Sequence, residues 1–261
     1  MTRNLSFILQ TLAWPCFCYK TPMLTLAAFS SRFTPLMFAA LLCWILCVTV
    51  HEFAHALVGY WGGDDTVKHR GLLTLDPTRF IDPINTLLIP AVVLLLGGFP
   101  LPGASVMIDR SRLKSEKWGS YVSAAGPASN FIIFLLMCIP LHPKVGLVNP
   151  FADVQPTWVH FLGAMATLNM YGVLFNLIPV PPLDGFGIIE HKLDHETRWK
   201  LRQPQVGFGC LMVLMLILWN VPQAMIPFLY MLAWVTDILG IPLHLLMDGY
   251  YFVIFDMAPR A

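Results

Sequence analysis

Residues 36–61 read LMFAALLCWILCVTVHEFAHALVGYW, and this stretch decides the fold class. It is longer than the roughly 20 mostly apolar residues that a helix needs to cross the hydrocarbon core of a bilayer. Its carboxylate and imidazole side chains are confined to His51, Glu52 and His55. Such groups are costly inside a membrane and usually mark a functional site. The stretch therefore predicts a membrane-spanning helix that carries chemistry.

The composition of the whole chain agrees with this prediction. Hydrophobic residues make up 57% of the 261 residues, and charged residues only 12%. A soluble domain usually has about 45–50% apolar and about 25% charged residues. We therefore expect an all-α polytopic membrane protein with about five to six transmembrane helices and no large soluble domain. The formal net charge is +1, and no stripe of lysine and arginine remains outside the polar connections. No nucleic-acid partner is therefore expected.

Further apolar stretches follow residues 36–61, separated by polar connections. We expect the N-terminal residues 1–35 to form a weak span or an interfacial segment, because Pro15 interrupts their apolar run. The other apolar stretches are 84–100, 118–140, 157–179, 207–221 and the proline-interrupted run 223–247.

The charges of the connections predict the topology. Lys and Arg concentrate in 62–82, 101–117 and 186–206, whereas 141–156 contains only Lys144. Positively charged connections usually lie on the cytoplasmic side of a membrane. The three rich connections are therefore predicted to be cytoplasmic, and 141–156 to lie outside.

This topology constrains the segment 84–100. If it begins and ends on the cytoplasmic side it cannot cross, and its short length and Pro90 favour a re-entrant segment. Helices 36–61 and 157–179 then run in the same direction, from outside to inside. Their C-terminal ends are expected at the same cytoplasmic depth.

The motif His51-Glu52-Phe53-Ala54-His55 lies at the inner end of the first of these helices. The i, i+4 spacing places both imidazoles on one helical face, where they can bind one zinc ion. Glu52 is then placed to take a proton from a zinc-bound water. The motif predicts a hydrolytic zinc site.

A hydrolytic zinc site needs a third protein ligand. Asp184 is the first candidate, because the proline-rich segment NLIPVPPLDG (176–185) follows the parallel helix and brings this carboxylate to the depth of His55. Two carboxylates, from Glu52 and Asp184, would also balance the zinc charge. Cys47 is the alternative, because it lies one helical turn before His51.

Three motifs together resemble the site-2 protease family of intramembrane zinc metalloproteases. They are HEFAH (51–55), AGPASN (125–130) and NLIPVPPLDG (176–185), and RGLLTLDP (70–77) and IDPI (81–84) lie between them. The resemblance covers about 36–190 and is to the compact bacterial type without a PDZ domain. It implies a catalytic core over 36–190, followed by membrane-embedded C-terminal helices over 191–261.

The resemblance also implies the site. It gives His51, His55 and Asp184 as ligands of one zinc ion per chain and Glu52 as the catalytic base. It places Asn130 near the scissile carbonyl, where its amide would donate to the oxyanion. A hydrogen bond between helices is the alternative role of Asn130. A short strand-like segment is implied near the active site, although 101–108 (LPGASVMI) departs from the family pattern.

The implied function is hydrolysis of a peptide bond in or near a transmembrane segment, as in regulated intramembrane proteolysis. The implied partners are a membrane protein substrate with a transmembrane helix and the lipid bilayer. The expected location is a bacterial inner membrane, with the active site toward the cytoplasm. The alternative is a non-proteolytic membrane metal-binding protein or transporter, which would have no need of a base such as Glu52 between the two histidines.

Overall fold

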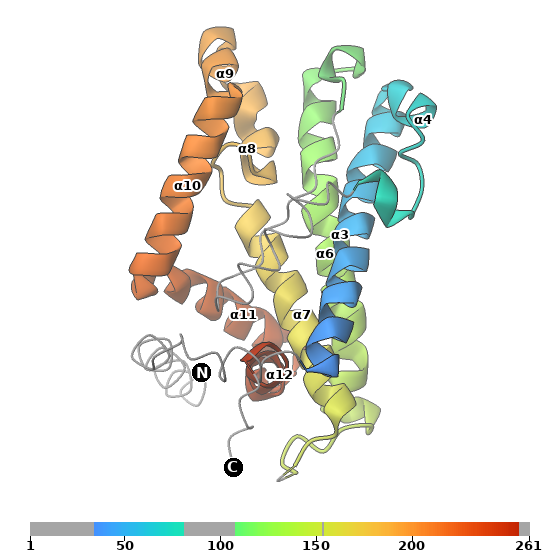
Figure 1. Ribbon diagram of the computed structural model, residues 1–261, viewed down its shortest axis with the longest axis vertical. Helices are drawn as coiled ribbons and strands as arrows, with labels where there is room; N and C mark the ends of the chain where they lie inside the picture. The colour runs from blue at the N-terminus through green and yellow to red at the C-terminus, as the bar shows by residue number, and fades with distance from the viewer. Residues whose placement is uncertain (1–33, 81–107, 153, 256–261) are drawn as a thin grey trace.

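The computed structural model describes residues 34–80, 108–152 and 154–255, and every regular element in these ranges is a helix. The all-α prediction is thereby confirmed. Figure 1 shows the arrangement of these elements. The α-helices are α3 (Pro35–Gly62), α4 (Thr66–His69), α6 (Glu116–Leu141), α7 (Thr157–Asn176), α8 (Asp184–Ile189), α9 (His195–Leu201), α10 (Pro204–Asn220), α11 (Ile226–Leu239) and α12 (Leu243–Phe255). Short 3-10 turns are η1 (Pro77–Arg79), η3 (Arg110–Arg112), η4 (Pro143–Val145), η5 (Glu190–Lys192) and η6 (Pro222–Met225).

Three helices in the described ranges, α3, α6 and α7, are long and apolar enough to cross a membrane. A fourth span arises if α9 and α10, which meet at a bend of 66°, are counted as one. The apolar run 223–247 does not form a single span. Gly240 adopts a left-handed conformation with φ +69° and ends α11, and α12 begins at Leu243. The resulting helices of 14 and 13 residues are shorter than the roughly 20 residues that a span needs.

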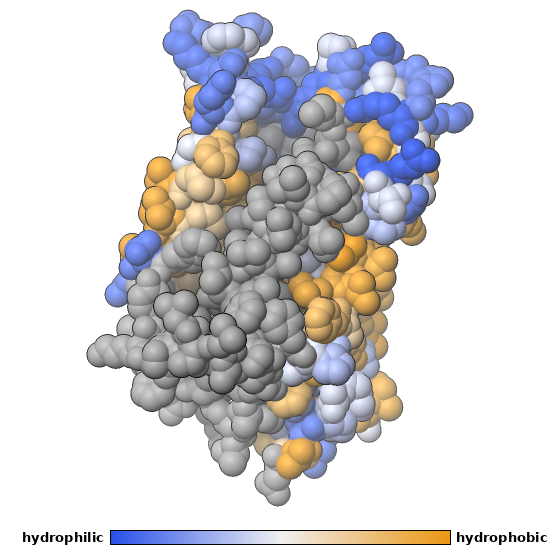
Figure 2. Space-filling model, viewed as in Figure 1, coloured by the Kyte–Doolittle hydropathy of each residue, from blue (hydrophilic) through white to orange (hydrophobic). Residues whose placement is uncertain are grey.

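The described residues therefore contain three or four candidate spans rather than the expected five or six. The expected re-entrant segment 84–100 and the strand-like 101–107 lie outside the described residues, as do residues 1–33. In Figure 2, hydrophilic residues gather at the upper end of the molecule, and hydrophobic residues predominate among the coloured residues below it.

Helix α3 continues without interruption through the HEFAH motif. The side chain of Thr34 caps its first turn by accepting a hydrogen bond from the Met37 N–H at 3.1 Å, and Pro35 takes the first helical position. Gly63, with φ +116°, ends the helix after the motif. Both histidines thus lie in regular helix, as their spacing requires.

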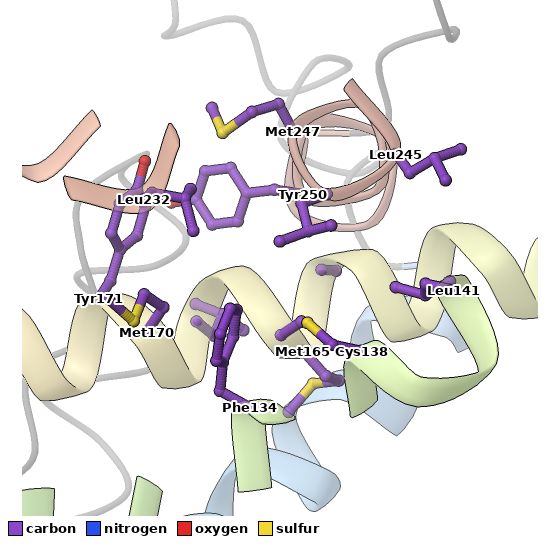
Figure 3. Packing of buried hydrophobic residues seen from close by; sticks show 14 of the residues in the cluster. Phe134, Cys138, Leu141, Met165, Met170, Tyr171, Leu232, Leu245, Met247 and Tyr250 are labelled. Carbon is purple, nitrogen blue, oxygen red and sulfur yellow. The ribbon is translucent and has the colours of Figure 1, made fainter. Parts of the chain in front are cut away.

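Helix α7 is the central helix, and most of its side chains are buried. It lies beside α3 and α6, and α12 lies across it (Figure 3). Glycines make this crossing close, because a Cβ added at Gly249 would lie 2.4 Å from the His160 carbonyl oxygen. A Cβ at Gly163 would lie 2.3 Å from the Leu245 carbonyl oxygen. Small residues allow helices in membranes to approach in this way.

The helix directions agree with the predicted topology. Helices α3 and α7 run in the same direction, and α6 runs in the opposite one (Figure 1). The Lys114 N–H donates to the Gly62 carbonyl at 2.8 Å, and Arg112 lies 2.9 Å from the Asp65 carboxylate. The described parts of these connections, 62–80 and 108–117, therefore meet at one end of the bundle, as predicted. That this end faces the cytoplasm stays a prediction.

Cysteine labelling in a thiol-free background tests the topology. We expect Asp65→Cys and Ser115→Cys to react with a membrane-impermeant thiol reagent only after the cytoplasmic face is opened, because their positions are exposed at the same end. Val145→Cys is the control, since Val145 is exposed in the connection at the other end of α6. It should react in intact cells. Labelling of Asp65→Cys and Ser115→Cys from opposite faces would contradict this topology.

Candidate metal centre

Two imidazoles from adjacent turns of α3 form the first half of the site. The Nε2 atoms of His51 and His55 lie 3.1 Å apart. The other ring nitrogen of His55, Nδ1, lies 2.6 Å from the Val122 carbonyl oxygen on α6. If this nitrogen donates its proton to the carbonyl, Nε2 keeps its lone pair free for a metal. This role of Val122 leaves no signal in the sequence, because every residue has a backbone carbonyl.

Asp184 supplies the second half of the site from the first position of α8. Its carboxylate oxygens lie 3.2 Å from His51 Nε2 and 3.3 Å from His55 Nε2. The segment before it folds back tightly: a Cβ at Gly185 would lie 2.2 Å from the Leu177 carbonyl oxygen. Glycine at position 185 therefore allows the chain to return toward α7 and bring Asp184 to the histidines.

The three groups have the geometry and chemistry of a zinc site. In the described part of the chain, they form one group whose ligand atoms all lie within 4.8 Å of one another. Zinc bonds of about 2.0–2.2 Å in tetrahedral geometry place two ligand atoms roughly 3.3–3.5 Å apart. The observed separations of 3.1 to 3.3 Å are close to this value. Two imidazoles and one carboxylate, with a fourth position for water, are a common set in zinc hydrolases.

Gly126 on α6 faces the same point between the imidazoles. A Cβ added at this position would lie 2.3 Å from His55 Nε2 and 2.4 Å from His51 Nε2. A side chain here would occupy the space that a metal ion needs. In the sequence, Gly126 is notable only as part of a family motif, and the structure gives the physical reason for a glycine.

Glu52 lies on α3 between the two histidines, and only 3% of it is exposed. A buried carboxylate is costly unless charge or hydrogen bonds compensate for the lost hydration. Its place beside a predicted cation site provides such compensation. The structure thus keeps Glu52 inside the bundle, with the two imidazoles on the same helix.

Cys47 lies away from this group. Its buried Sγ lies 3.5 Å from the Asn169 amide nitrogen on α7, at the next helix interface. The metal-binding group found among the described residues contains Asp184 and not the thiol. The geometry therefore favours the carboxylate over the alternative ligand.

Asn130 lies one turn beyond Gly126 on α6 and is 3% exposed. It faces α7, because a Cβ at Gly172 would lie 3.1 Å from its Nδ2. Its Oδ1 accepts no hydrogen bond from the residues that the structure describes. The bond between helices considered from the sequence is thus not formed by this oxygen within those residues.

Substitution of Gly126 tests the close approach of α6. We expect Gly126→Ala to lose most of the bound metal, because its methyl group would lie between the two Nε2 atoms. Gly209→Ala on α10 is the matched control, since a Cβ there would meet no heavy atom within 4 Å. Metal content per chain, measured on purified protein in detergent, gives the answer. Equal metal content in the two variants would show that the site lies elsewhere.

Comparison with known proteins identifies the family. The profile of peptidase family M50 matches residues 142–221. The chain is 32% identical over 209 residues to "Putative zinc metalloprotease Rip2" of Mycolicibacterium smegmatis, covering 79% of this chain and 76% of the relative. It is 33% identical over 206 residues to the protein of the same name from Mycobacterium tuberculosis, with the same coverage.

A third relative is "Putative zinc metalloprotease YwhC" of Bacillus subtilis, 37% identical over 181 residues, covering 66% of this chain and 76% of the relative. No solved structure matches the chain. The names of these relatives and the His51, His55 and Asp184 group agree on zinc as the metal. The chain belongs to peptidase family M50, the site-2 protease family, and is a zinc metalloprotease.

Proposed function

We propose that this protein is an intramembrane protease that hydrolyses a peptide bond in or near a transmembrane segment of another membrane protein. The observation that carries the proposal is the position of the candidate metal centre. His51, Glu52 and His55 are buried in a candidate membrane span, and Asp184 meets them from the segment after a second candidate span. A site built between such helices is placed for a substrate that lies in the membrane.

In this proposal, His51, His55 and Asp184 hold one zinc ion. When bound, zinc polarises the scissile carbonyl and makes water a stronger acid. The charges of Asp184 and Glu52 offset that of the metal, which lowers the cost of burying the site.

Glu52 moves the proton. Its carboxylate accepts a proton from the attacking water and then delivers it to the amine nitrogen of the departing peptide. The Asn130 amide donates a hydrogen bond to the substrate carbonyl oxygen as that oxygen gains negative charge. The Asn130 Oδ1, an acceptor with no donor among the described residues, is open to an N–H of the substrate backbone.

The substrate is a membrane protein whose transmembrane helix unwinds locally before cleavage, because helical carbonyls are shielded and hydrogen-bonded. Regulated intramembrane proteolysis is the process that such an activity serves. The protein acts in the bacterial inner membrane as a multi-pass protein, and the arginines and lysines around the end of the bundle that carries the site support a cytoplasmic position for it.

The ligand assignment predicts which substitutions release zinc. Asp184→Ala should lose most of the bound zinc, because two imidazoles alone hold it poorly. Cys47→Ala should keep it, since the thiol lies at the interface with Asn169. Zinc per chain, measured by elemental analysis of protein purified in detergent, tests both. Retention in the first variant and loss in the second would reverse the assignment.

Glu52→Gln separates proteolysis from metal binding. Glutamine keeps the shape of the side chain but cannot accept the proton at neutral pH, and general-base assistance contributes about 10²–10⁴-fold. We expect cleavage of a model transmembrane substrate in liposomes to fall by at least about 10²-fold, with zinc content unchanged. His51→Ala is the comparison, because it should lose both zinc and cleavage. A zinc-loaded Glu52→Gln protein with full cleavage would rule out this mechanism, and metal flux without proteolysis in the native protein would favour the transporter.

A further inference from the structure

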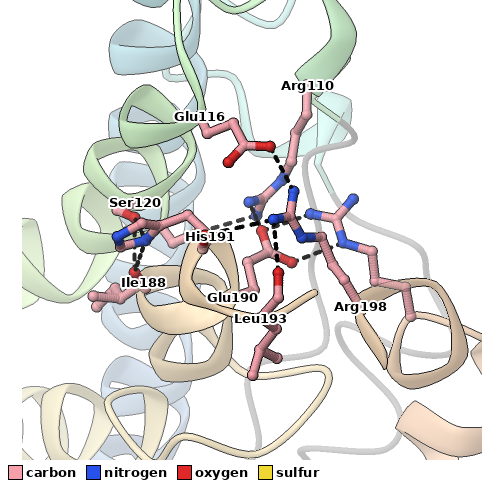
Figure 4. A network of polar contacts seen from close by, with 10 residues as sticks. Arg110, Glu116, Ser120, Ile188, Glu190, His191, Leu193 and Arg198 are labelled. Carbon is pink, nitrogen blue, oxygen red and sulfur yellow. Dashed lines mark hydrogen bonds and ion pairs between the residues drawn. The ribbon is translucent and has the colours of Figure 1, made fainter. Parts of the chain in front are cut away.

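A cluster of charges around the buried Glu190 lies just after the helix that carries Asp184 (Figure 4). Glu190, in the 3-10 turn after α8, is 4% exposed. Its carboxylate pairs with the Arg110 guanidinium from η3 and with Arg202, whose Nε and Nη2 lie 2.8 and 2.6 Å from the carboxylate oxygens. We call Glu190, Arg110 and Arg202 the Glu190 cluster.

Arg110 extends this cluster to α6. Its Nη2 donates to the Ser123 hydroxyl at 3.1 Å. Burial and the nearby charge of Arg202 lower the pKa of Arg110 to about 10, and the charge of Asp184 opposes that shift. Arg110 therefore stays charged at neutral pH. It joins the segment after α8 to α6 while lying within electrostatic reach of Asp184.

Polar contacts between α8 and α6 run through the same region. A Cβ at Gly187 would lie 2.3 Å from the Ser123 hydroxyl oxygen, so the two helices touch there. The Ser120 hydroxyl donates to the Ile188 carbonyl at 2.7 Å and lies 2.9 Å from His191 Nδ1 (Figure 4). Helix α8 has only six residues and follows a proline-rich segment, so it depends on such contacts for its position.

Helix α6 is also the surface that fixes the histidines. Val122, adjacent to Ser123, accepts the contact of His55 Nδ1, and Gly126 touches both Nε2 atoms. Helix α6 thus contacts both the imidazoles, which precede it in the chain, and the short helix that carries the Asp184 carboxylate, which follows it. A shift of α8 on α6 would move Asp184 relative to His51 and His55.

We propose that Glu190 is a positioning residue for the metal centre: with Arg110 and Ser123, it fixes α8 on α6 so that the Asp184 carboxylate meets both imidazoles. This proposal rests on the proposed role of Asp184 as a zinc ligand. It differs from a purely structural ion pair, because it requires that the effect of Glu190 on zinc pass through Asp184.

Zinc affinity of the full chain in detergent, measured by competition with a chelator, provides the first test. Substitution of groups that orient metal ligands typically costs about 10–100-fold in affinity. We expect Glu190→Gln to weaken zinc binding within this range. Glu196→Gln is the matched control, since Glu196 forms an exposed pair with Lys200 on α9. Its zinc affinity should equal that of the native protein.

A double-mutant cycle with Asp184→Ala separates positioning from general destabilisation. If Glu190 acts through Asp184, Glu190→Gln should cause no further loss of zinc affinity once Asp184 is alanine. A full additional loss, or no loss in the single Glu190→Gln variant, would overturn the positioning role while Asp184 remains a ligand. Unchanged affinity in Asp184→Ala itself would overturn the metal centre and this inference with it.

Arg110→Lys keeps the test valid if Glu190→Gln does not fold. Lysine retains the charge but lacks the planar fork that contacts both Glu190 and Ser123. We expect a smaller loss of zinc affinity, which again disappears in the Asp184→Ala background. A loss that persists there would contradict the proposal. Size-exclusion profiles and thermal unfolding midpoints identify variants that are not folded.

Discussion

The structure depends on bringing three buried polar groups and one half-buried carboxylate together inside an apolar bundle. His51, Glu52 and His55 come from α3, and Asp184 comes from a segment more than a hundred residues later. None of these groups is stable alone in an apolar interior, because burial removes water that nothing else replaces. A zinc ion with two imidazoles and two carboxylates nearby satisfies this requirement. The helices around the site form the frame that holds His51, His55 and Asp184 within a few ångströms of each other.

Helix α6 is the part of this frame that contacts both halves of the site. It runs against α3 and α7 and presents a carbonyl at Val122, a hydroxyl at Ser123 and a bare backbone at Gly126. The Val122 carbonyl contacts His55, and the Ser123 hydroxyl contacts Arg110 of the Glu190 cluster. Gly126 faces the Nε2 atoms of both histidines. Bulky side chains at these positions would separate the helices. The glycine of AGPASN (125–130) follows from this close approach.

Apolar contacts hold the helices together at one end of the bundle, and polar contacts do so at the other. Toward one end, α12 lies across α7 at a crossing formed by glycines, and a large apolar cluster surrounds it (Figure 3). Toward the other end, arginines, glutamates and serines join α8, η5 and α6 (Figure 4). Hydrolysis needs water as well as a metal, so a polar end of the bundle is a suitable place for the site. The short α8 cannot bury enough apolar surface to fix itself, and charge pairs take that role.

The sequence by itself determined the membrane class, the helical fold and the meeting of the two parallel helices at one end. It could do so because apolar length, the i, i+4 spacing of His51 and His55 and the distribution of lysine and arginine are local properties. It also favoured Asp184, because the chain direction and the prolines constrain where that carboxylate lies. Only the tertiary structure decided that Gly126 faces the imidazoles and that Glu190 pairs with Arg110. These features depend on contacts between residues far apart in the chain, and such contacts leave no spacing or composition signal in a single sequence.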